Sequence, residues 1–263
     1  MEVKKEFKYV ILEKEDNIYR ILLNNPKLNL ISLDLLDDLN SAIDIISADK
    51  ASRVVLVEGN NNVFSAGADL KNSKFNNTQD LVDFFRKGER VFRRLSDIPS
   101  ITIAVMKGFA FGGGLELSIA CDLRISDEST MLGLPEVTLG LIPGWGGTQR
   151  LARLIGVSRA MGFIMTGERI NAMEAYNIGL INKIHKEDLS KYALEYAKNL
   201  ASTVSPVSAM VAKRLVNKAT EVPMDVGLDM EALGGAALYG LSDFKEGINA
   251  FFEKRKPVFK GLP

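Results

Sequence analysis

The sequence predicts an α/β fold in which strands occupy the first two thirds of the chain and helices the last third. Short runs of β-branched and aliphatic residues alternate with stretches of helical periodicity as far as residue 126, which is the pattern of an α/β domain. From residue 149 onward the periodicity is mostly helical. No internal repeat, low-complexity tract or linker composition interrupts the chain. We therefore expect one globular unit, with a core over residues 1–200 and a helical C-terminal region over residues 201–263.

The first half of the chain contains most of the expected strands. Residues 9–12 and 18–23 flank a polar turn, and this arrangement predicts a hairpin. Ser32 is a suitable N-cap for the helix that follows, in which leucine and isoleucine recur on one face. Further strands are expected at residues 53–57, 101–105 and 123–126, and a helix is expected at residues 80–95.

The second half is dominated by helical patterns. Residues 131–151 are rich in glycine and proline, yet they are too apolar for an ordinary surface loop. A strand-like run follows at residues 180–184. The remaining periodicity predicts helices at residues 189–200, 207–216, 224–239 and 244–252.

The composition excludes several classes of function. Lysine plus arginine and aspartate plus glutamate balance at 33 each, so no net charge attracts the chain to nucleic acid or to a membrane surface. The N-terminus lacks the apolar segment of a signal peptide, and no apolar run is long enough to span a bilayer. A single cysteine excludes an internal disulfide and a cysteine metal cluster, and it fits a cytoplasmic location. We expect no metal site, no nucleic-acid partner and no membrane partner.

Two glycine-rich turns each follow an expected strand. The first is SAGAD, residues 65–69, and the second is FGGGLE, residues 111–116. If the two strands are neighbours in one sheet, backbone N–H groups of Ala66 and Gly113 can converge on one oxygen, as in an oxyanion hole. The alternative is that the glycines only permit tight turns. Neither turn fits the glycine patterns of dinucleotide-binding folds or P-loops.

Two glutamates complete the candidate site. Glu116 lies in an otherwise apolar helix, where a carboxyl group is costly to bury unless it has a role. Glu136 follows Pro135, which suits the first position of a helix, in equally apolar surroundings. Such a pair can act as general acid and base with pKa values raised or split by the environment. The alternative is two unrelated residues, one of which caps a helix.

Other reactive residues are weaker candidates. The only histidine, His185, stands beside charged residues at the end of a strand-like run and indicates a surface role. Cys121 is interpreted as a small core residue. The basic residues of the C-terminal segment 253–261 are usually a solvated face, although they could also bind a polyphosphate.

Three motifs in order give the sequence a resemblance to a known family. They are FSAGADL, KGFAFGGGLELSIACDLRIS and LGLPEVTLGLIPGWGGTQRLARLIG. Together they resemble the crotonase superfamily and, within it, the enoyl-CoA hydratases, and the match extends essentially from end to end. The chain departs from the family in its N-terminal motif, where Asn25 stands in place of the usual arginine before Pro26.

The resemblance implies a fold and a site. The implied fold is a crotonase-like spiral of ββα units with a helical C-terminal region that builds a trimer, commonly paired into a hexamer. The implied reaction is the addition of water across the 2,3 double bond of a 2-enoyl-CoA, or its reverse. It needs no cofactor, since coenzyme A enters as part of the acyl-CoA substrate. Glu116 and Glu136 correspond to the family's acid/base pair, and Ala66 and Gly113 correspond to its oxyanion hole. The implied CoA contacts are Ala66, Gly67, Ala68, Asp69, Leu70 and Gly144, with a weaker case for Lys254, Lys256 and Lys260.

Two alternatives stay open. A double-bond isomerase of the same fold often relies on one carboxylate, at the position of Glu136, so the presence of both glutamates favours a hydratase. The presence of both is also compatible with a lyase or hydrolase that acts on an unusual acyl-CoA. A crotonase-like chain can also serve without catalysis as a scaffold that binds RNA or a partner enzyme.

Overall fold

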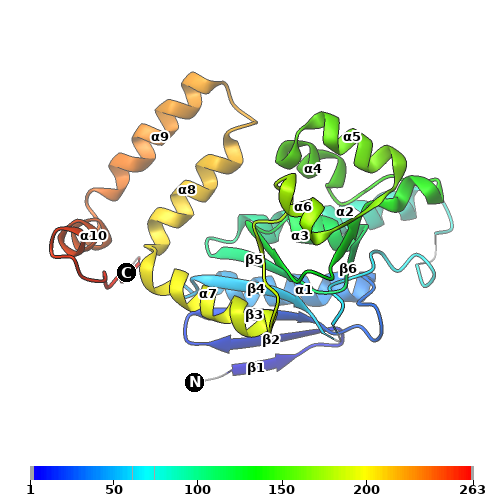
Figure 1. The fold of residues 1–263 in the computed structure, drawn as a ribbon, viewed down its shortest axis with the longest axis horizontal. Helices are drawn as coiled ribbons and strands as arrows, with labels where there is room; N and C mark the ends of the chain where they lie inside the picture. The colour runs from blue at the N-terminus through cyan, green and yellow to red at the C-terminus, as the bar shows by residue number, and fades with distance from the viewer. Residues whose placement is uncertain (1–2, 61, 74, 262–263) are drawn as a thin grey trace.

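The structure is a computed structural model that describes residues 3–60, 62–73 and 75–261. A larger sheet carries helices on both faces, a smaller sheet lies beside it, and the last helices form an arm that extends away from the rest (Figure 1). The larger sheet has the strand order β1-β2-β3-β4-β5-β7-β10. Its strands are β1 (Val3–Glu6), β2 (Val10–Glu15), β3 (Ile18–Leu23), β4 (Val54–Gly59), β5 (Ile101–Met106), β7 (Leu123–Ser126) and β10 (Lys183–Ile184).

The centre of the larger sheet is parallel, and its strands are buried on both faces. β3, β4, β5 and β7 pair in parallel, whereas β1 and β2 add an antiparallel edge. Within β4, Val55 and Val57 belong to the core under α1 (Leu33–Ala48) and α2 (Thr78–Asp97), while Val54 and Leu56 face α7 (Leu189–Thr203). A continuous apolar run is what a strand covered on both faces requires.

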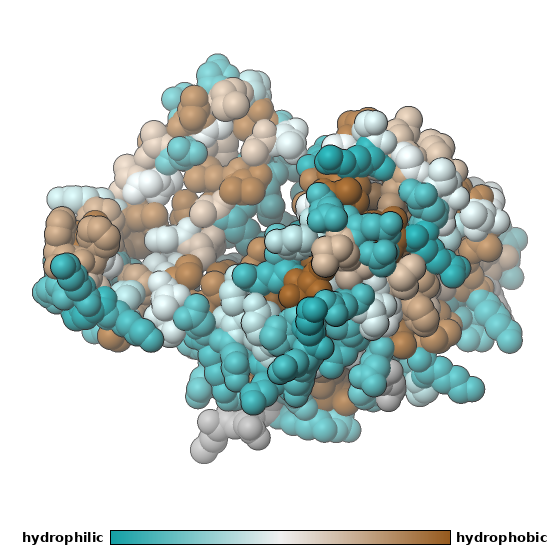
Figure 2. All heavy atoms as spheres, in the orientation of Figure 1, coloured by the Kyte–Doolittle hydropathy of each residue, from teal (hydrophilic) through white to brown (hydrophobic). Residues whose placement is uncertain are grey.

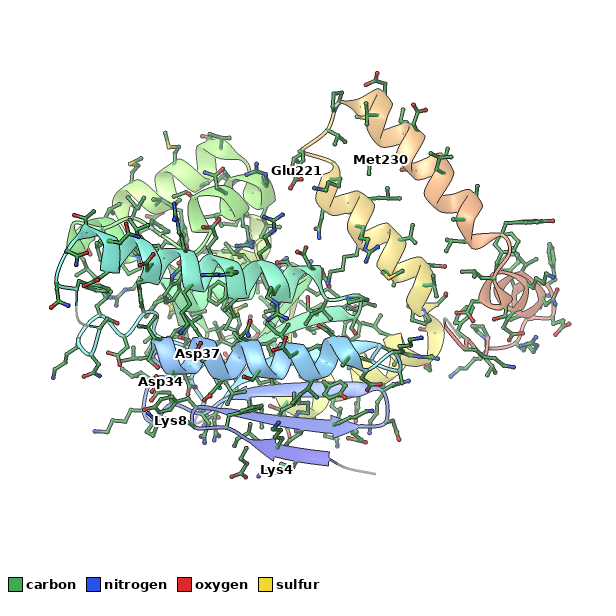
Figure 3. The ribbon with its side chains drawn as sticks, turned by 180° about the vertical axis from the view of Figure 1, so that it is seen from behind. Lys4, Lys8, Asp34, Asp37, Glu221 and Met230 are labelled. Atoms are coloured by element: carbon green, nitrogen blue, oxygen red, sulfur yellow. The ribbon has the colours of Figure 1, made fainter. Side chains whose placement is uncertain are left out.

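The helices α1 and α2 confirm two sequence predictions. The Ser32 hydroxyl accepts a hydrogen bond from the backbone N–H of Leu35 at 3.1 Å, so Ser32 is the N-cap of α1 as expected. α2 contains the whole of the helix predicted at residues 80–95. At the surface Asp34 pairs with Lys8 at 2.7 Å, close to the N-terminal end of α1 where a negative charge is favourable (Figure 3).

Each ββα unit consists of one strand of the larger sheet, one strand of the smaller sheet and a helix. β5 continues past Gly108, whose φ of 65° suits glycine, into β6 (Phe109–Phe111), and α3 (Gly113–Ile119) follows at once. β7 is followed in the same way by β8 (Met131–Gly133) and the 3₁₀ helix η1 (Pro135–Leu139). The smaller sheet has the order β6-β8-β9, with β9 at Arg169–Asn171. The predicted spiral of ββα units is confirmed.

Several element boundaries differ from the predictions. The strand expected at residues 180–184 is shortened to β10, because the N–H groups of Leu180 and Ile181 both donate to the carbonyl of Ala175 in the preceding helix. The strands β1, β6, β8 and β9 were not expected, and three of them have only three residues, too few to show alternation. The remaining helices of the core are α4 (Gly147–Ile155), α5 (Val157–Thr166) and α6 (Ala172–Asn177).

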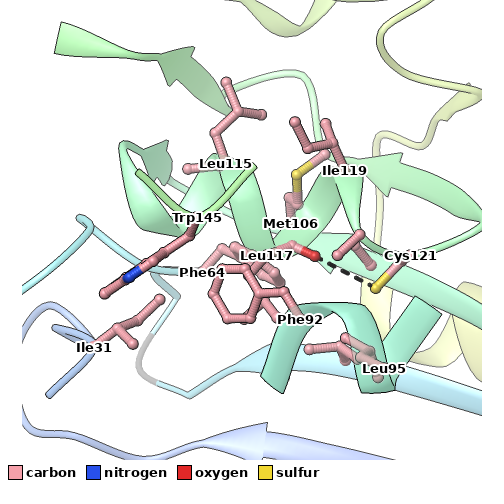
Figure 4. Packing of buried hydrophobic residues seen from close by; sticks show 14 of the residues in the cluster. Ile31, Phe64, Phe92, Leu95, Met106, Leu115, Leu117, Ile119, Cys121 and Trp145 are labelled. Carbon is pink, nitrogen blue, oxygen red and sulfur yellow. Dashed lines mark hydrogen bonds between the residues drawn. The ribbon is translucent and has the colours of Figure 1, made fainter. Parts of the chain in front are cut away.

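The main core lies between α1, α2, α3 and the larger sheet. Phe64, Phe92 and Trp145 are among its largest fully buried side chains (Figure 4). Cys121 is buried as predicted, with its thiol 3.7 Å from the carbonyl oxygen of Leu117, and burial raises its pKa to about 12. Leu115, Leu117 and Ile119 of α3 belong to this core, so apolar packing fixes the position of α3 on the larger sheet.

The C-terminal helices form an arm. α8 (Pro206–Lys218) and α9 (Met224–Leu238) make a hairpin that extends away from the sheets, and α10 (Ser242–Phe252) lies at its base (Figures 1 and 3). No residue of α9 is buried, although Met224, Leu228 and Leu233 are apolar. Figure 2 shows hydrophobic side chains at the surface of the arm. Within the described residues, no part of the same chain buries a side chain of α9. Residues 262–263 lie outside the described residues.

The base of the arm is fixed to the core by polar contacts. Lys213 of α8 donates to the Asp122 carboxylate at 2.8 Å and to the Ser100 carbonyl at 3.0 Å. Arg53 donates to the carbonyl of Ala201 in α7 at 2.7 Å and to the carbonyl of Phe259, after α10, at 2.5 Å. In the part of the chain that the structure describes, no helix is both long enough and apolar enough to cross a membrane.

Candidate active site

The two glycine-rich turns lie together at one edge of the larger sheet. β4 and β5 are neighbouring parallel strands, so the turns that follow them open on the same side. Ser65 pairs with Ala110: its N–H donates to the Phe109 carbonyl at 2.9 Å, and its carbonyl accepts from Phe111 N–H at 3.0 Å. The prediction that the two turns open at the same edge of one sheet is therefore confirmed.

Gly67 allows the closest approach of the two turns. Its φ is 104°, in the region that favours glycine. A Cβ built on it would lie 2.9 Å from the Phe111 carbonyl oxygen and 3.5 Å from the backbone nitrogen of Gly113. Any side chain at residue 67 would therefore push against the start of α3.

Gly113 supplies one free backbone donor. It is the first residue of α3, so its N–H has no partner within the helix. Among the described residues no acceptor hydrogen-bonds to this N–H, whereas the N–H of Gly112 donates to the Gly133 carbonyl at 2.9 Å. The positive end of the α3 dipole adds to the attraction of this N–H for a negatively charged oxygen.

The structure corrects the second donor. The N–H of Ala66 donates to the Leu28 carbonyl at 2.9 Å, so it is already used within the fold. The N–H of Asp69 and the carbonyl of Gly67 both bond to Ile31, at 3.0 and 2.8 Å. Because N–H groups alternate in direction along an extended segment, the N–H of Ala68 is directed to the opposite side. Within the described residues it has no acceptor.

Glu116 is held rigidly beneath the surface. Its side chain is 1% exposed, and its Oε1 accepts hydrogen bonds from the backbone N–H groups of Trp145 and Gly147, both at 2.7 Å. Burial raises the pKa of Glu116 to about 8; the N–H of Gly147 opposes this rise, and the neighbouring Glu136 carboxyl adds to it. The group can therefore exchange a proton near neutral pH.

Glu136 presents a carboxyl oxygen that the described residues leave without a hydrogen bond. It follows Pro135 in η1, and the helix ends at Gly140 with a φ of 73°. Its Oε2 is buried and has no hydrogen-bond partner among the described residues. Its Oε1 would lie 3.0 Å from a Cβ built on Gly112, so the carboxyl group borders the first turn of α3. Burial raises the pKa of Glu136 to about 7.

The two carboxyl groups form a proton-exchanging pair. Their pKa values of about 8 and about 7 indicate that the pair holds one proton and one negative charge between these pH values. One member can then accept a proton while the other donates one. The fold thus places Glu116 and Glu136 beside the backbone N–H of Gly113, which is free among the described residues, as the sequence predicted.

The other residues predicted to contact CoA differ in their distance from the two carboxyl groups and in what their side chains contact. Asp69 is buried and accepts hydrogen bonds from the N–H and the amide of Asn72, so its carboxylate serves the local turn. Leu70 packs against the core. Gly144 lies against the Phe85 ring, which would be 2.4 Å from a Cβ at residue 144. Lys254, Lys256 and Lys260 follow α10 in the tail, away from α3 in Figure 1.

Sequence reasoning missed three features of the site. The first is the role of the Trp145 and Gly147 backbone N–H groups as partners of Glu116. The second is the backbone N–H of Ala68, a residue predicted only as a CoA contact; this N–H is unpaired among the described residues. The third is Arg150, whose guanidinium donates to the carbonyl of Trp145 in this loop. Trp145 and Gly147 lie 29 and 31 positions from Glu116 in the sequence, so the spacing of residues does not predict that the loop of residues 143–147 contacts the Glu116 carboxylate. His185 stacks on Tyr192 at 4.0 Å, outside the site, as its predicted surface role implies.

Comparison with known proteins agrees with the predicted family. Residues 13–262 match the family described as enoyl-CoA hydratase/isomerase. The short-chain-enoyl-CoA hydratase of Clostridium acetobutylicum is 38% identical over 254 residues, covering 95% of this chain and 97% of that protein. The mitochondrial enoyl-CoA hydratase of Pongo abelii is 39% identical over 259 residues, covering 97% and 88%.

Solved structures show the same fold. A crystal structure described as an enoyl-CoA hydratase from Bacillus anthracis superposes with a TM-score of 0.92 at 37% identity, covering 97% of this chain and 100% of the other. The chain therefore belongs to the enoyl-CoA hydratase/isomerase family.

Proposed function

We propose that the protein is an enoyl-CoA hydratase, which adds water across the 2,3 double bond of a 2-enoyl-CoA or catalyses the reverse dehydration. The observation that carries the proposal is the pair of buried carboxyl groups, Glu116 and Glu136, beside the free N–H of Gly113. The names of the relatives support the same reaction, since they include a short-chain-enoyl-CoA hydratase and a crotonyl-CoA hydratase.

The proposed mechanism uses the singly protonated pair in the form that carries the proton on Glu136. This form is in equilibrium with the form protonated on Glu116, the group of higher pKa. The thioester oxygen accepts hydrogen bonds from Gly113 and Ala68, which draws electron density away from C3. A water molecule between the carboxyl groups gives a proton to Glu116 as its oxygen bonds to C3. Glu136 gives its proton to C2 as the enolate collapses. Glu136 has then lost a proton to C2 and Glu116 has gained one from water, and transfer of a proton from Glu116 to Glu136 restores the starting state.

Substrate binding is proposed for the segment beside this pair. Residues 66–70 and Gly144 are the candidates for contact with the CoA portion and the attacking water. Gly67 and Ala68 have the best support, because they border Gly113 directly. No cofactor is needed, because coenzyme A is carried by the substrate and the chemistry consists only of proton transfers and C–O bond formation.

A panel of acyl-CoA substrates tests the proposal. We expect loss of the enoyl-thioester absorbance with crotonyl-CoA and with longer 2-enoyl-CoAs, and formation of 3-hydroxyacyl-CoA detected by mass spectrometry. A higher kcat/KM for the conversion of 3-enoyl-CoA to 2-enoyl-CoA would instead identify an isomerase. An absence of acyl-CoA turnover together with salt-sensitive RNA binding would indicate a scaffold.

The exposed apolar residues of the arm support an oligomer. Met224, Leu233 and Phe251 are 78%, 73% and 77% exposed, which is unfavourable for large apolar side chains in water. We propose a homotrimer, or a hexamer formed by two trimers. Light scattering coupled to size exclusion should give a mass three or six times the 28.9 kDa of the chain. A monomer at micromolar concentration would contradict this proposal.

A further inference from the structure

Three consecutive peptide groups connect Glu116 to a half-buried arginine, Arg150. The N–H groups of Trp145 and Gly147 donate to Glu116 Oε1. Between them lies the carbonyl of Trp145, which accepts a hydrogen bond from Arg150 Nη1 at 3.0 Å. The same loop thus presents its donors to the carboxyl group and its acceptor to the guanidinium.

Gly146 makes this arrangement possible. Its φ of 109° favours glycine, and its carbonyl accepts the backbone N–H of Arg150 at 2.7 Å. A Cβ at residue 146 would lie 2.2 Å from Arg150 Nη1. The guanidinium therefore packs directly on the glycine backbone, and a side chain at residue 146 would displace it.

Arg150 is also a charge beside the carboxyl pair. It is half-buried, and its positive charge opposes the rise in the pKa of Glu116 that burial causes. The other charged or titratable groups that face Arg150 are Glu89 and Asp97 of α2, and Cys121. Glu136, from η1, is the other ionisable group that faces Glu116. Arg150 is thus a positive charge that favours the ionised form of Glu116.

We propose that Arg150 is a positioning residue for Glu116, which it holds through the peptide groups of residues 145–147 and keeps ionisable by its charge. The part of this proposal that concerns catalysis rests on the proposed hydratase function. The structural part does not, because the hydrogen bonds and the charge exist without substrate. Glu116 is oriented by the loop, and the loop is oriented by the guanidinium.

Two substitutions separate the charge from the hydrogen bond. Arg150→Gln removes the charge and retains a donor, whereas Arg150→Lys retains the charge but lacks the planar fork that packs on Gly146. Arg153→Gln is the matched control, because Arg153 lies on the same helix and is exposed, with hydrogen bonds only to Gln149 among the described residues. Far-UV circular dichroism and thermal melting establish that each variant is folded.

The first readout is the ionisation of Glu116 itself, measured without turnover. Glutamate labelled with ¹³C at the carboxyl carbon is titrated by NMR, and the Glu116 signal is assigned by its absence in Glu116→Gln. We expect Arg150→Gln to move the Glu116 titration to higher pH by about one pH unit. The Arg150→Lys and Arg153→Gln curves should overlie that of the wild type. An Arg150→Gln curve that coincides with the wild type, or a displaced Arg150→Lys curve, would overturn the proposal.

The second readout is the pH profile of kcat/KM for hydration of crotonyl-CoA. A bell-shaped profile is expected for the wild type, because catalysis needs one proton on the pair. Arg150→Gln should displace both limbs to higher pH, and Arg150→Lys should lower kcat about tenfold with the limbs unmoved. A uniform loss in Arg150→Gln without displacement would show a merely structural role and contradict the proposal. If the wild type does not hydrate enoyl-CoA, the proposed function fails, and the NMR titration alone decides the role of Arg150.

Discussion

Substitution of Glu136 by glutamine is expected to lower kcat for hydration of crotonyl-CoA by about a thousandfold. Glutamine has nearly the same shape, but its amide cannot supply the proton that C2 requires. Because Oε2 of Glu136 makes no hydrogen bond to the described residues, the substitution should leave the fold intact. The measurement is the initial rate of loss of the enoyl-thioester absorbance at saturating substrate.

The control for this substitution is Glu168→Gln. Glu168 is exposed and lies in the turn before β9, so its replacement should leave kcat within about twofold of the wild type. A Glu136→Gln enzyme with wild-type kcat would contradict the assignment of the acid. Equal losses in both variants would point to a general effect on the fold.

Substitution of Glu116 by glutamine is expected to make the protein more resistant to unfolding at alkaline pH. The pKa of Glu116 is raised from its ordinary value of 4.5 to about 8 in the folded protein. Between these values the unfolded chain binds fewer protons than the folded one, so the free energy of unfolding of the wild type falls as the pH rises. Glutamine does not ionise and therefore avoids this loss.

The expected size follows from the linkage between pKa and stability. Relative to Glu116→Gln, the wild type should lose about 1.4 kcal/mol of unfolding free energy per pH unit across the range between the two pKa values. Urea denaturation at pH 5, 7 and 9 measures this difference. Glutamine retains an oxygen that can accept the N–H groups of Trp145 and Gly147, so the comparison isolates the charge. A pH-independent difference would show that the pKa of Glu116 is not raised in the folded protein.

The expected pH dependence of the wild-type stability and the expected role of Glu116 in catalysis both follow from the burial of its carboxyl group. An acid that must exchange protons near neutrality has to be kept out of water, and this burial is unfavourable once the group ionises. The N–H groups of Trp145 and Gly147 offset part of the cost, and the charge of Arg150 offsets another part.

The fold could be predicted from the sequence to the extent that local patterns express it. β-branched runs and helical periodicity predicted the central strands, and the cap at Ser32 predicted the start of α1. The arm was predicted as helices but not as an extended structure. A helical pattern shows that an apolar face exists, and it does not show whether the same chain or another copy covers that face.

The site was predicted only in part, for a geometrical reason. Residue type identified Glu116, Glu136 and the glycine turns, because these residues are unusual in apolar surroundings. The identity of the second backbone donor depended on which N–H groups the fold leaves unpaired. That pairing is set by contacts of Ala66 with Leu28 and of Gly67 with Ile31, between residues more than 30 positions apart, and no local pattern expresses it.

The most direct test of the central claim is a double-mutant cycle on the two carboxyl groups. It compares kcat/KM for crotonyl-CoA hydration in the wild type, Glu116→Gln, Glu136→Gln and the double variant. If the two groups act as one acid/base unit, each single variant should lose at least about a hundredfold, and the double variant should be no more than about tenfold worse than the poorer single variant. A double variant whose loss equals the product of the two single losses, or a single variant with wild-type kcat/KM, would contradict it.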